Sequence, residues 1–259
     1  MFLLLKIIFF SKKIILLSSP LQALNYKELI FINKDLNRKL LNTPILIYSD
    51  NEQDKRYNEI NYLLKSFIIK NNVINIRKKL LLNITYVLIQ IRKKLYFNYN
   101  LIVVGNLFSN INKEFIKISK EAIILDDGTN IFDQSNIIEK KKHNYNFFSI
   151  FEKKYFKQNH YKKNNLLFLK KKLGNRIKKT NDVFFIGSPY VRLDYLKEDD
   201  YLKLIKKTLE SLKLSKIFYI PHPKENTNFL KKIKYINIVN TNYPVEIFFL
   251  NYNRYPKLI

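Results

Sequence analysis

The 259-residue chain contains no cysteine and no tryptophan, and it has only one methionine, four glycines and seven prolines. Without cysteine, a disulfide framework, a thiolate metal site and a cysteine nucleophile are excluded. An absence of disulfides is typical of cytoplasmic proteins, and we expect that location, with peripheral contact at the inner membrane as an open alternative. The 47% of hydrophobic residues predicts a folded chain with a sizeable core.

Acidic residues are scarce beside basic ones. The 21 Asp and Glu residues are outnumbered by 47 Lys and Arg residues, which gives a formal net charge of +26. Such a charge attracts nucleic acid, other polyanions and anionic lipid surfaces. Only seven of the basic residues are arginine, the side chain preferred for bidentate phosphate contacts. We therefore expect no specific nucleic-acid partner, and keep a basic protein bound to nucleic acid or membrane as the non-enzyme alternative.

Long hydrophobic runs are also missing. The apolar run over residues 1–10 is interrupted by Lys6 and is shorter than the about 20 residues that a membrane-spanning helix needs. We interpret it as an additional segment or a peripheral anchor.

The chain does contain short apolar runs that alternate with helix-like segments, a pattern typical of α/β proteins. Residues 139–179 are rich in Lys, Asn and aromatic residues and are interpreted as an interdomain region with a helix near 165–173. The expected strands cover 14–17, 44–48, 73–76, 121–125, 215–219 and 236–240, and the expected helices cover 79–94 and 109–120.

The string LDDG follows the expected strand 121–125, so Asp126 and Asp127 lie at the carboxyl end of that strand. Ligands of open α/β sheets bind beyond these ends. Because neighbouring strand residues point to opposite faces, at most one carboxylate looks into such a crevice, and the other fixes the loop. Gly128 permits a tight turn after the acids. The alternative is an ordinary Asp-Gly turn.

The string IPHP follows the expected strand 215–219 and places His222 between two prolines, Pro221 and Pro223. Prolines restrict the backbone around the histidine, so little entropy is lost in keeping the imidazole aimed at a ligand. Near its ordinary pKa of about 6.5, imidazole can donate a proton or a hydrogen bond to a leaving phosphate.

A third string, SSPLQALNYKEL at 18–29, follows the expected strand 14–17 and predicts the opening βα unit of a Rossmann-like domain. Gln22 and Asn25 are three residues apart, so they share one face of the first helical turn, near a bound ligand. Helix capping by Ser18 or Ser19 is the alternative for the serines. Glu246, at the start of a later expected helix, suits either ribose hydroxyls or the helix dipole.

With these strings in this order, the chain resembles the bacterial sialyltransferases of glycosyltransferase family 52 and the related bacterial sialyl- and polysialyltransferases. Asp126, Asp127 and Gly128 match the family's D/E-D/E-G motif, and His222 and Pro223 match its HP motif. The segment FFIGSPY at 184–190, which contains Gly187 and Ser188, looks like the start of the family's second domain, and LIVVGNLFS at 101–109 looks like its central strand.

The resemblance implies a GT-B-like α/β architecture, in which two Rossmann-like domains face a cleft. Residues 1–165 would form the acceptor-side domain and residues 181–259 the nucleotide-sugar domain. Related enzymes continue beyond the position of Ile259, so the resemblance also implies a shortened second domain. A truncated, inactive homologue is therefore an alternative.

The implied activity is inverting, metal-independent transfer of sialic acid from CMP-sialic acid to a hydroxyl of a lipooligosaccharide or capsule glycan, with no cofactor besides the donor substrate. In that scheme a carboxylate of the acidic motif is the general base, and His222 contacts the leaving CMP phosphate. Lys224, directly after the HP pair, either adds charge near the donor or is one more solvated lysine of this basic chain. Glu246 holds the nucleotide. A family member that uses another sugar nucleotide is the alternative enzyme, and a homodimer is an open alternative for the assembly.

Overall fold

The structure is a computed structural model in which the chain divides into two compact units, Met1–Lys172 and Leu173–Ile259. Each unit is described by itself. The structure describes residues 1–40, 42–48, 56–65, 73–127, 144–156, 161–173, 178–179, 182–212, 216–222, 225–233, 235–239, 245, 248 and 254–255.

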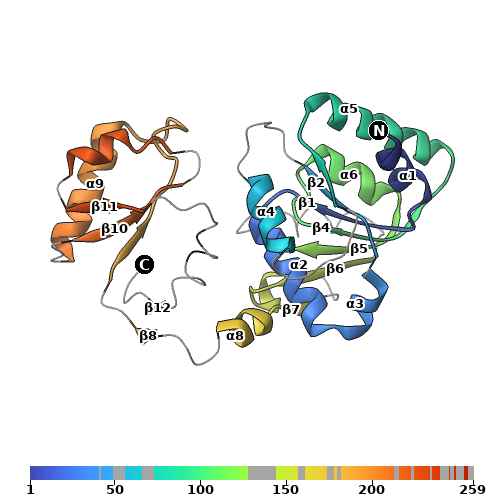
Figure 1. Ribbon diagram of the computed structural model, residues 1–259, viewed down its shortest axis with the longest axis horizontal. Coiled ribbons are helices and arrows are strands. Elements are labelled where there is room, and N and C mark those ends of the chain that lie inside the picture. Colours follow the sequence, from blue (N-terminus) through green and yellow to red (C-terminus); the bar gives the residue numbers. More distant parts are fainter. Residues whose placement is uncertain are drawn as a thin grey trace. The chain divides into compact units, whose positions relative to one another are not determined.

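Unit 1 is built on a seven-stranded sheet with the strand order β3-β2-β1-β4-β5-β6-β7, and all neighbouring strands run parallel (Figure 1). The α/β class predicted from the sequence is confirmed. The strands are β1 Lys13–Leu17, β2 Ile45–Tyr48, β3 Val73–Ile76, β4 Tyr99–Val104, β5 Ser119–Leu125, β6 Asn144–Ser149 and β7 Tyr161–Lys163.

Helices cover both faces of this sheet, which explains why its central strands are continuous apolar runs. In Figure 1, α1, α5 and α6 lie on one side of the sheet, and α2 and α4 lie on the other. The helices of unit 1 are α1 Phe2–Phe10, α2 Pro20–Ile32, α3 Lys34–Leu40, α4 Arg56–Lys65, α5 Lys79–Lys94, α6 Asn110–Lys117 and α8 Leu167–Leu173, and a short 3-10 turn, η1, covers Lys153–Tyr155.

Two regions differ from the sequence-based expectation. Within 139–179, which we interpreted as an interdomain region, β6 and β7 extend the main sheet; their apolar content is too interrupted by polar residues for a periodic pattern. The run 1–10 is a helix, α1, whose Leu4, Ile7 and Ile8 belong to the main core. In the part of the chain that the structure describes, no helix is long and apolar enough to cross a membrane.

Unit 2 contains a second parallel sheet, with the strand order β11-β10-β9. Its core joins α9 to these strands through Tyr201, Ile205 and Tyr219. The elements are β9 Phe184–Ile186, α9 Glu198–Ser211, β10 Ile217–Ile220, the 3-10 turn η3 Asn228–Lys232, β11 Ile236–Ile238, and a separate parallel pair of β8 Lys178–Lys179 with β12 Arg254–Tyr255. The cleft expected between two domains stays a prediction.

Candidate active site

The acidic motif lies at the carboxyl edge of the unit 1 sheet. Asp126 and Asp127 follow β5 directly, and Ser18 and Ser19 follow β1. Parallel strands all end at the same edge, where loops and helix N-termini converge and ligands of α/β sheets bind. The topology therefore brings the LDDG string and the SSPLQALNYKEL string together, although they are about a hundred residues apart in the chain.

Asp126 points into the protein and fixes the loop that follows β6. Its side chain is 1% exposed, and its Oδ2 accepts a hydrogen bond from the backbone N–H of Ile150 at 2.7 Å. Burial raises the pKa of Asp126 to about 6, although hydrogen bonds from the Ser149 side chain and the Ile150 amide lower it in part. The carboxyl group is therefore close to half protonated just below neutral pH.

Asp127 is only partly buried and points toward the start of α2. The hydroxyl of Ser19, the N-cap of α2, donates a hydrogen bond to Asp127 Oδ1 at 2.9 Å and accepts one from the backbone N–H of Gln22 at 3.2 Å. The N-terminal end of a helix carries partial positive charge, which favours an anionic group there. Of the two carboxylates, Asp127 is the one that solvent can reach.

The two amides of α2 are both bonded to protein groups. Asn25 donates from Nδ2 to the backbone oxygen of Asp126 at 3.2 Å and accepts at Oδ1 from Asn164 at 2.8 Å. Gln22 Oε1 accepts from the backbone N–H of Ser18 at 2.8 Å. Both amides are buried. Asn25 braces the acidic loop, and Gln22 braces Ser18 ahead of α2; direct contact with a substrate stays a prediction.

Three buried polar atoms at this edge make no hydrogen bond with any residue that the structure describes: Tyr48 Oη, Asn112 Oδ1 and Asp126 Oδ1. Tyr48 ends β2, Asn112 lies in the first turn of α6, and Asp126 follows β5. Burial raises the pKa of Tyr48 to about 12, with the side chains of Ser109 and Ser18 nearby. Unsatisfied buried polar groups are uncommon in proteins, so these atoms leave hydrogen-bonding capacity unused at this edge of the sheet.

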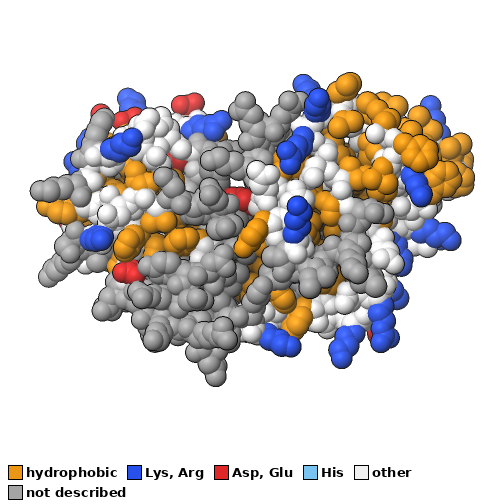
Figure 2. All heavy atoms as spheres, in the orientation of Figure 1, with side chains coloured by type: hydrophobic (Ala, Val, Ile, Leu, Met, Phe, Trp, Pro, Cys, Tyr) orange, Lys and Arg blue, Asp and Glu red, His pale blue; other side chains and the backbone are white. Residues whose placement is uncertain are grey.

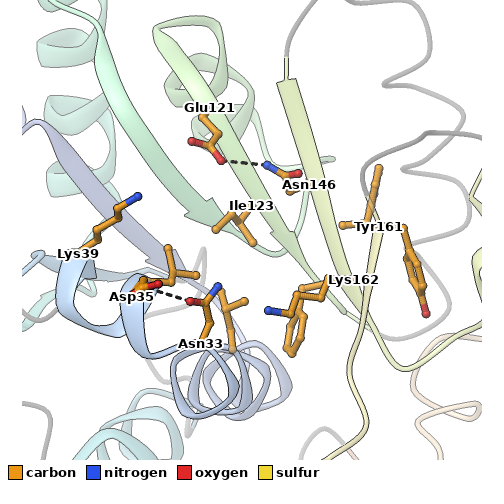
Figure 3. A pocket seen from close by; sticks show the side chains of 12 residues that line it. Asn33, Asp35, Lys39, Glu121, Ile123, Asn146, Tyr161 and Lys162 are labelled. Atoms are coloured by element: carbon orange, nitrogen blue, oxygen red, sulfur yellow. Dashed lines mark hydrogen bonds between the residues drawn. The ribbon is translucent and has the colours of Figure 1, made fainter.

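A separate pocket of about 490 Å³ lies on the α2–α3 side of the same sheet, away from the acidic motif (Figure 3). It is lined by Glu121 and Asn146 from the early parts of β5 and β6, and by Lys39 of α3. Asn146 Nδ2 donates to Glu121 Oε1 at 3.0 Å, and neither Asp126 nor Asp127 lines the pocket. We assign no catalytic role to it.

The carboxyl edge of the unit 2 sheet brings together the residues that follow β9 and β10. Gly187 and Ser188 come after β9, and His222 comes after β10. The backbone N–H of Gly187 donates to the oxygen of Ile220 at 2.8 Å, so the two loops start side by side. The structure thus places Gly187, Ser188 and His222 at one edge of unit 2.

A chain of hydrogen bonds lies beneath these two loops. The backbone N–H of Ser188 donates to Tyr201 Oη at 3.2 Å, and Tyr201 Oη lies 3.0 Å from Tyr219 Oη. Tyr219 Oη donates to Glu225 Oε1 at 2.5 Å, and Glu225 Oε2 accepts from the backbone N–H of His222 at 3.0 Å. Because Tyr219 uses its proton toward Glu225, Tyr201 is the donor between the two phenols.

We call Tyr201, Tyr219 and Glu225 the tyrosine–glutamate relay. Burial raises the pKa of Glu225, which hydrogen bonds from Tyr219 and His222 lower in part. Gly187 is required by this relay, since a Cβ atom there would lie 2.2 Å from Glu225 Oε2 and 2.5 Å from Tyr219 Oη. The relay therefore ties the histidine loop to the Gly187 loop at fixed spacing.

The other predicted site residues lie outside the described residues. These are Gly128, Pro223, Lys224 and Glu246. Among the residues that are described, no cluster of three or more His, Asp or Glu side chains has the arrangement of a metal site.

Sequence reasoning missed several residues of both edges. Glu225 has a local signal, because a carboxylate three residues after His222 can return to the amide of that residue. Asn164 and Tyr201 have no such local signal, since each bonds a residue in another segment of the chain, Asn25 and Ser188 respectively. Ser19 caps α2, as the sequence indicated. Its hydrogen bond to Asp127 joins residues 108 positions apart and has no local signal in the sequence.

Comparison of the chain with known proteins identifies its family. No curated protein and no solved structure matches the chain. A sequence profile described as Alpha-2,8-polysialyltransferase (POLYST) matches residues 3–259. This match confirms the resemblance to sialyltransferases, while membership of glycosyltransferase family 52 stays a prediction. A sialyltransferase family implies a nucleotide-sugar donor and a glycan acceptor. The chain belongs to the alpha-2,8-polysialyltransferase family.

Proposed function

We propose that this protein transfers a sialyl residue from CMP-sialic acid to a hydroxyl of a surface glycan, with inversion at the anomeric carbon and without a metal ion. The observation that carries the proposal is the placement of Asp127 in a partly open position at the carboxyl edge of the main sheet. The family match along residues 3–259 supports sialyl transfer as the reaction class.

Asp127 is the proposed general base. It is accessible, whereas Asp126 is buried and bonded to the loop after β6. The carboxylate of Asp127 takes the proton of the acceptor hydroxyl as that oxygen bonds to the anomeric carbon of sialic acid. Asp126 and Asn25 position this loop. A base placed in this way contributes roughly 10² to 10⁴ in rate.

His222 is the proposed partner of the leaving group. As the bond between the anomeric carbon and the phosphate oxygen breaks, CMP departs with the electron pair, and the imidazole donates a hydrogen bond or a proton to that phosphate. The tyrosine–glutamate relay supports this role, since it fixes the His222 backbone from below. Gly187 and Ser188 supply backbone next to the same site.

The remaining predicted contacts keep the roles that the sequence analysis assigns to them. Lys224 and Glu246 interact with the donor, and Gly128 and Pro223 shape the loops next to Asp127 and His222. No cofactor besides the donor substrate is proposed. The assembly state is a homodimer or a monomer.

The acceptor is a glycan of the cell surface, such as lipooligosaccharide or capsule. The description of the matched family points to α-2,8-linked sialic acid, and each sialic acid residue of such an acceptor carries a carboxylate. A chain with a net charge of +26 attracts such a polyanion.

The test is isothermal titration of the full chain with CMP, together with transfer from CMP-sialic acid to a sialylated oligosaccharide. Binding of CMP that is lost in His222→Ala, and transfer that is lost in Asp127→Asn, would support the proposal. Transfer from a UDP- or GDP-sugar in place of CMP-sialic acid would favour the other family chemistry. Indifference to CMP with salt-sensitive RNA binding would overturn the enzymatic proposal.

A further inference from the structure

A large exposed apolar surface lies over α1, the outer side of α5 and the turn that follows α5. Figure 2 shows hydrophobic side chains gathered over this end of unit 1. Phe2, Phe10 and Tyr96 are 82%, 81% and 88% exposed, values at which most of the ring is in water. The exposed apolar members are Phe2, Leu3, Phe10, Leu80, Val87, Ile91, Leu95, Tyr96 and Phe97, and we call them the apolar surface.

Helix α5 has apolar residues on two sides. Leu88 and Ile89 face the core, while Leu80, Val87 and Ile91 are exposed. These three are seven and four residues apart, so they share one face of the helix. A helix of a soluble domain ordinarily exposes polar residues on that face, and contiguous exposed apolar area marks an interaction site.

Arg92 holds the parts of this surface together. Its buried guanidinium donates from Nε to the backbone oxygen of Phe97 at 2.6 Å and from Nη2 to that of Ser11 at 3.1 Å, and Nη1 bonds the oxygen of Ile8. The guanidinium also lies over the ring of Tyr99, 3.6 Å from its centre. The end of α1 and the turn 95–97 are therefore fixed beside each other.

The charged residues of α1, α5 and the turn that follows α5 are all basic. Residues 1–27 and 60–113 contain no Asp or Glu. Over the same elements, residues 1–13 contribute three lysines, and residues 77–97 contribute six lysines and arginines. Among these, Lys6, Lys93 and Lys94 are exposed. The neighbouring acidic residue, Glu114 of α6, accepts from Gln90 of α5 and is buried. Exposed aromatic side chains with exposed lysines among them are typical of surfaces that bind the interface of an anionic bilayer.

We propose that the apolar surface rests on an anionic lipid bilayer, with its aromatic rings at the headgroup level and its lysines against the lipid phosphates. Tyr suits this depth because it joins an apolar ring to a polar hydroxyl, and Phe and Leu suit the boundary between headgroups and acyl chains. The helices lie on the bilayer and do not enter it. The proposal is independent of the transfer reaction, since no residue of the acidic motif or of the tyrosine–glutamate relay belongs to the surface.

A second copy of this chain is a poorer occupant. A two-fold symmetric contact would place the same patch on itself, and each patch brings basic residues with no acidic partner from 1–27 or 60–113. Like charges at such a contact repel. An anionic lipid surface supplies the missing negative charge.

The proposal is tested by sedimentation of the full chain with large vesicles of phosphatidylcholine, either pure or mixed with phosphatidylglycerol. We expect at least tenfold tighter binding to the anionic vesicles. The aromatic variant removes three exposed rings and uses Asn at position 96, where the positive φ of 58° suits Asn. It consists of Phe10→Gln, Tyr96→Asn and Phe97→Gln, and its matched control in unit 2 consists of Leu193→Gln, Tyr195→Gln and Tyr235→Gln.

We expect the aromatic variant to lose at least tenfold in affinity for anionic vesicles, and the control to stay within twofold of the unaltered chain. A lysine variant should lose at least tenfold as well, with a weaker salt dependence, since each lysine near the surface contributes about 1 kcal/mol. That variant is Lys6→Gln, Lys93→Gln and Lys94→Gln, and its control on α9 is Lys203→Gln, Lys206→Gln and Lys207→Gln.

Unchanged melting temperatures show that the variants fold, so a loss of binding reports on the surface. Equal binding to neutral and anionic vesicles, or equal losses in the variants and their controls, would overturn the proposal. A dimer in sedimentation velocity that dissociates in the aromatic variant would also overturn it, in favour of a second copy.

Discussion

The carboxyl edges of the two sheets are built from the same topology but differ in how their polar groups are satisfied. At the edge of unit 1, Tyr48, Asn112 and Asp126 each bury a polar atom without a hydrogen bond from any described residue. At the edge of unit 2, the tyrosine–glutamate relay connects its polar groups from Ser188 to His222. The first edge leaves hydrogen-bonding capacity unused, and the second uses its capacity to fix a loop.

Under the proposed function, this difference corresponds to a division of roles between the two edges. A site that binds a variable polar acceptor benefits from unused donors and acceptors. A site that aligns one histidine with one phosphate benefits from a preset geometry. Substitutions at the two edges can test this contrast.

The largest expected effect is that of Asp127→Asn. The amide keeps the shape of the carboxylate but cannot take a proton, so turnover should fall by roughly 10² to 10⁴. Asp126→Asn should lose far less, because its amide oxygen still accepts from Ile150. Turnover is measured with CMP-sialic acid and a sialylated acceptor, and Asp194→Asn, at an exposed position with φ of 57°, is the control. Equal, small losses in both motif variants would remove the acidic motif from the mechanism.

The second prediction concerns stability and pH at Asp126. Its pKa is about 6 in the folded state, against an ordinary value of 3.8 for an aspartate in water, so the folded protein binds the proton more tightly than the unfolded chain. The stabilisation is present below about pH 4 and is lost as the pH rises through 6. A shift of about two units corresponds to at most ~3 kcal/mol.

Asp126→Asn removes the loss of stability at neutral pH, because an amide carries no charge. We expect the variant and the unaltered chain to have similar unfolding free energies at pH 4, and the variant to be up to ~3 kcal/mol more stable at pH 7. Urea unfolding at both pH values measures the difference. A difference that stays constant with pH would contradict the view that Asp126 occupies a site unfavourable to its charge.

The third prediction compares one glycine from each edge. In Gly187→Ala the new Cβ meets Tyr219 and Glu225, and the Tyr219 ring is buried and stacked on Phe185 at 5.5 Å. In Gly105→Ala the Cβ lies 2.1 Å from Cδ of Gln22, a buried but flexible side chain. We expect a loss of about 2 kcal/mol for the first and about 1 kcal/mol for the second, by urea unfolding. A larger loss in Gly105→Ala than in Gly187→Ala would show that Tyr219 and Glu225 move aside more easily than Gln22.

The smallest expected effect on turnover is that of Glu225→Gln. The relay needs two acceptor atoms, and an amide offers one, so either Tyr219 or the His222 amide loses its partner. We expect about a tenfold lower kcat with little change in KM for the acceptor. Glu210→Gln, at an exposed position of α9, is the control. A change in melting temperature without a change in kcat would make Glu225 structural only.

The sequence was sufficient to predict the α/β class and the positions of Asp126 and His222, because both follow short apolar runs whose burial is a local property. It was insufficient for β6 and β7, because polar residues interrupt both strands and leave no periodic apolar pattern. The bonds of Asn164 to Asn25 and of Ser19 to Asp127 could not be read from spacing, because each joins residues more than a hundred positions apart. Contacts between distant elements are set by topology and not by local pattern.

The hydrogen bonds of Arg92 have a practical consequence for N-terminal truncation of the chain. Deleting α1 would remove the carbonyls of Ile8 and Ser11 and leave a buried cation short of acceptors, besides uncovering Leu88 and Ile89. A protein truncated before α5 to improve its solubility is therefore expected to misfold and precipitate. Substitution of individual exposed aromatic residues is the safer way to obtain a soluble sample.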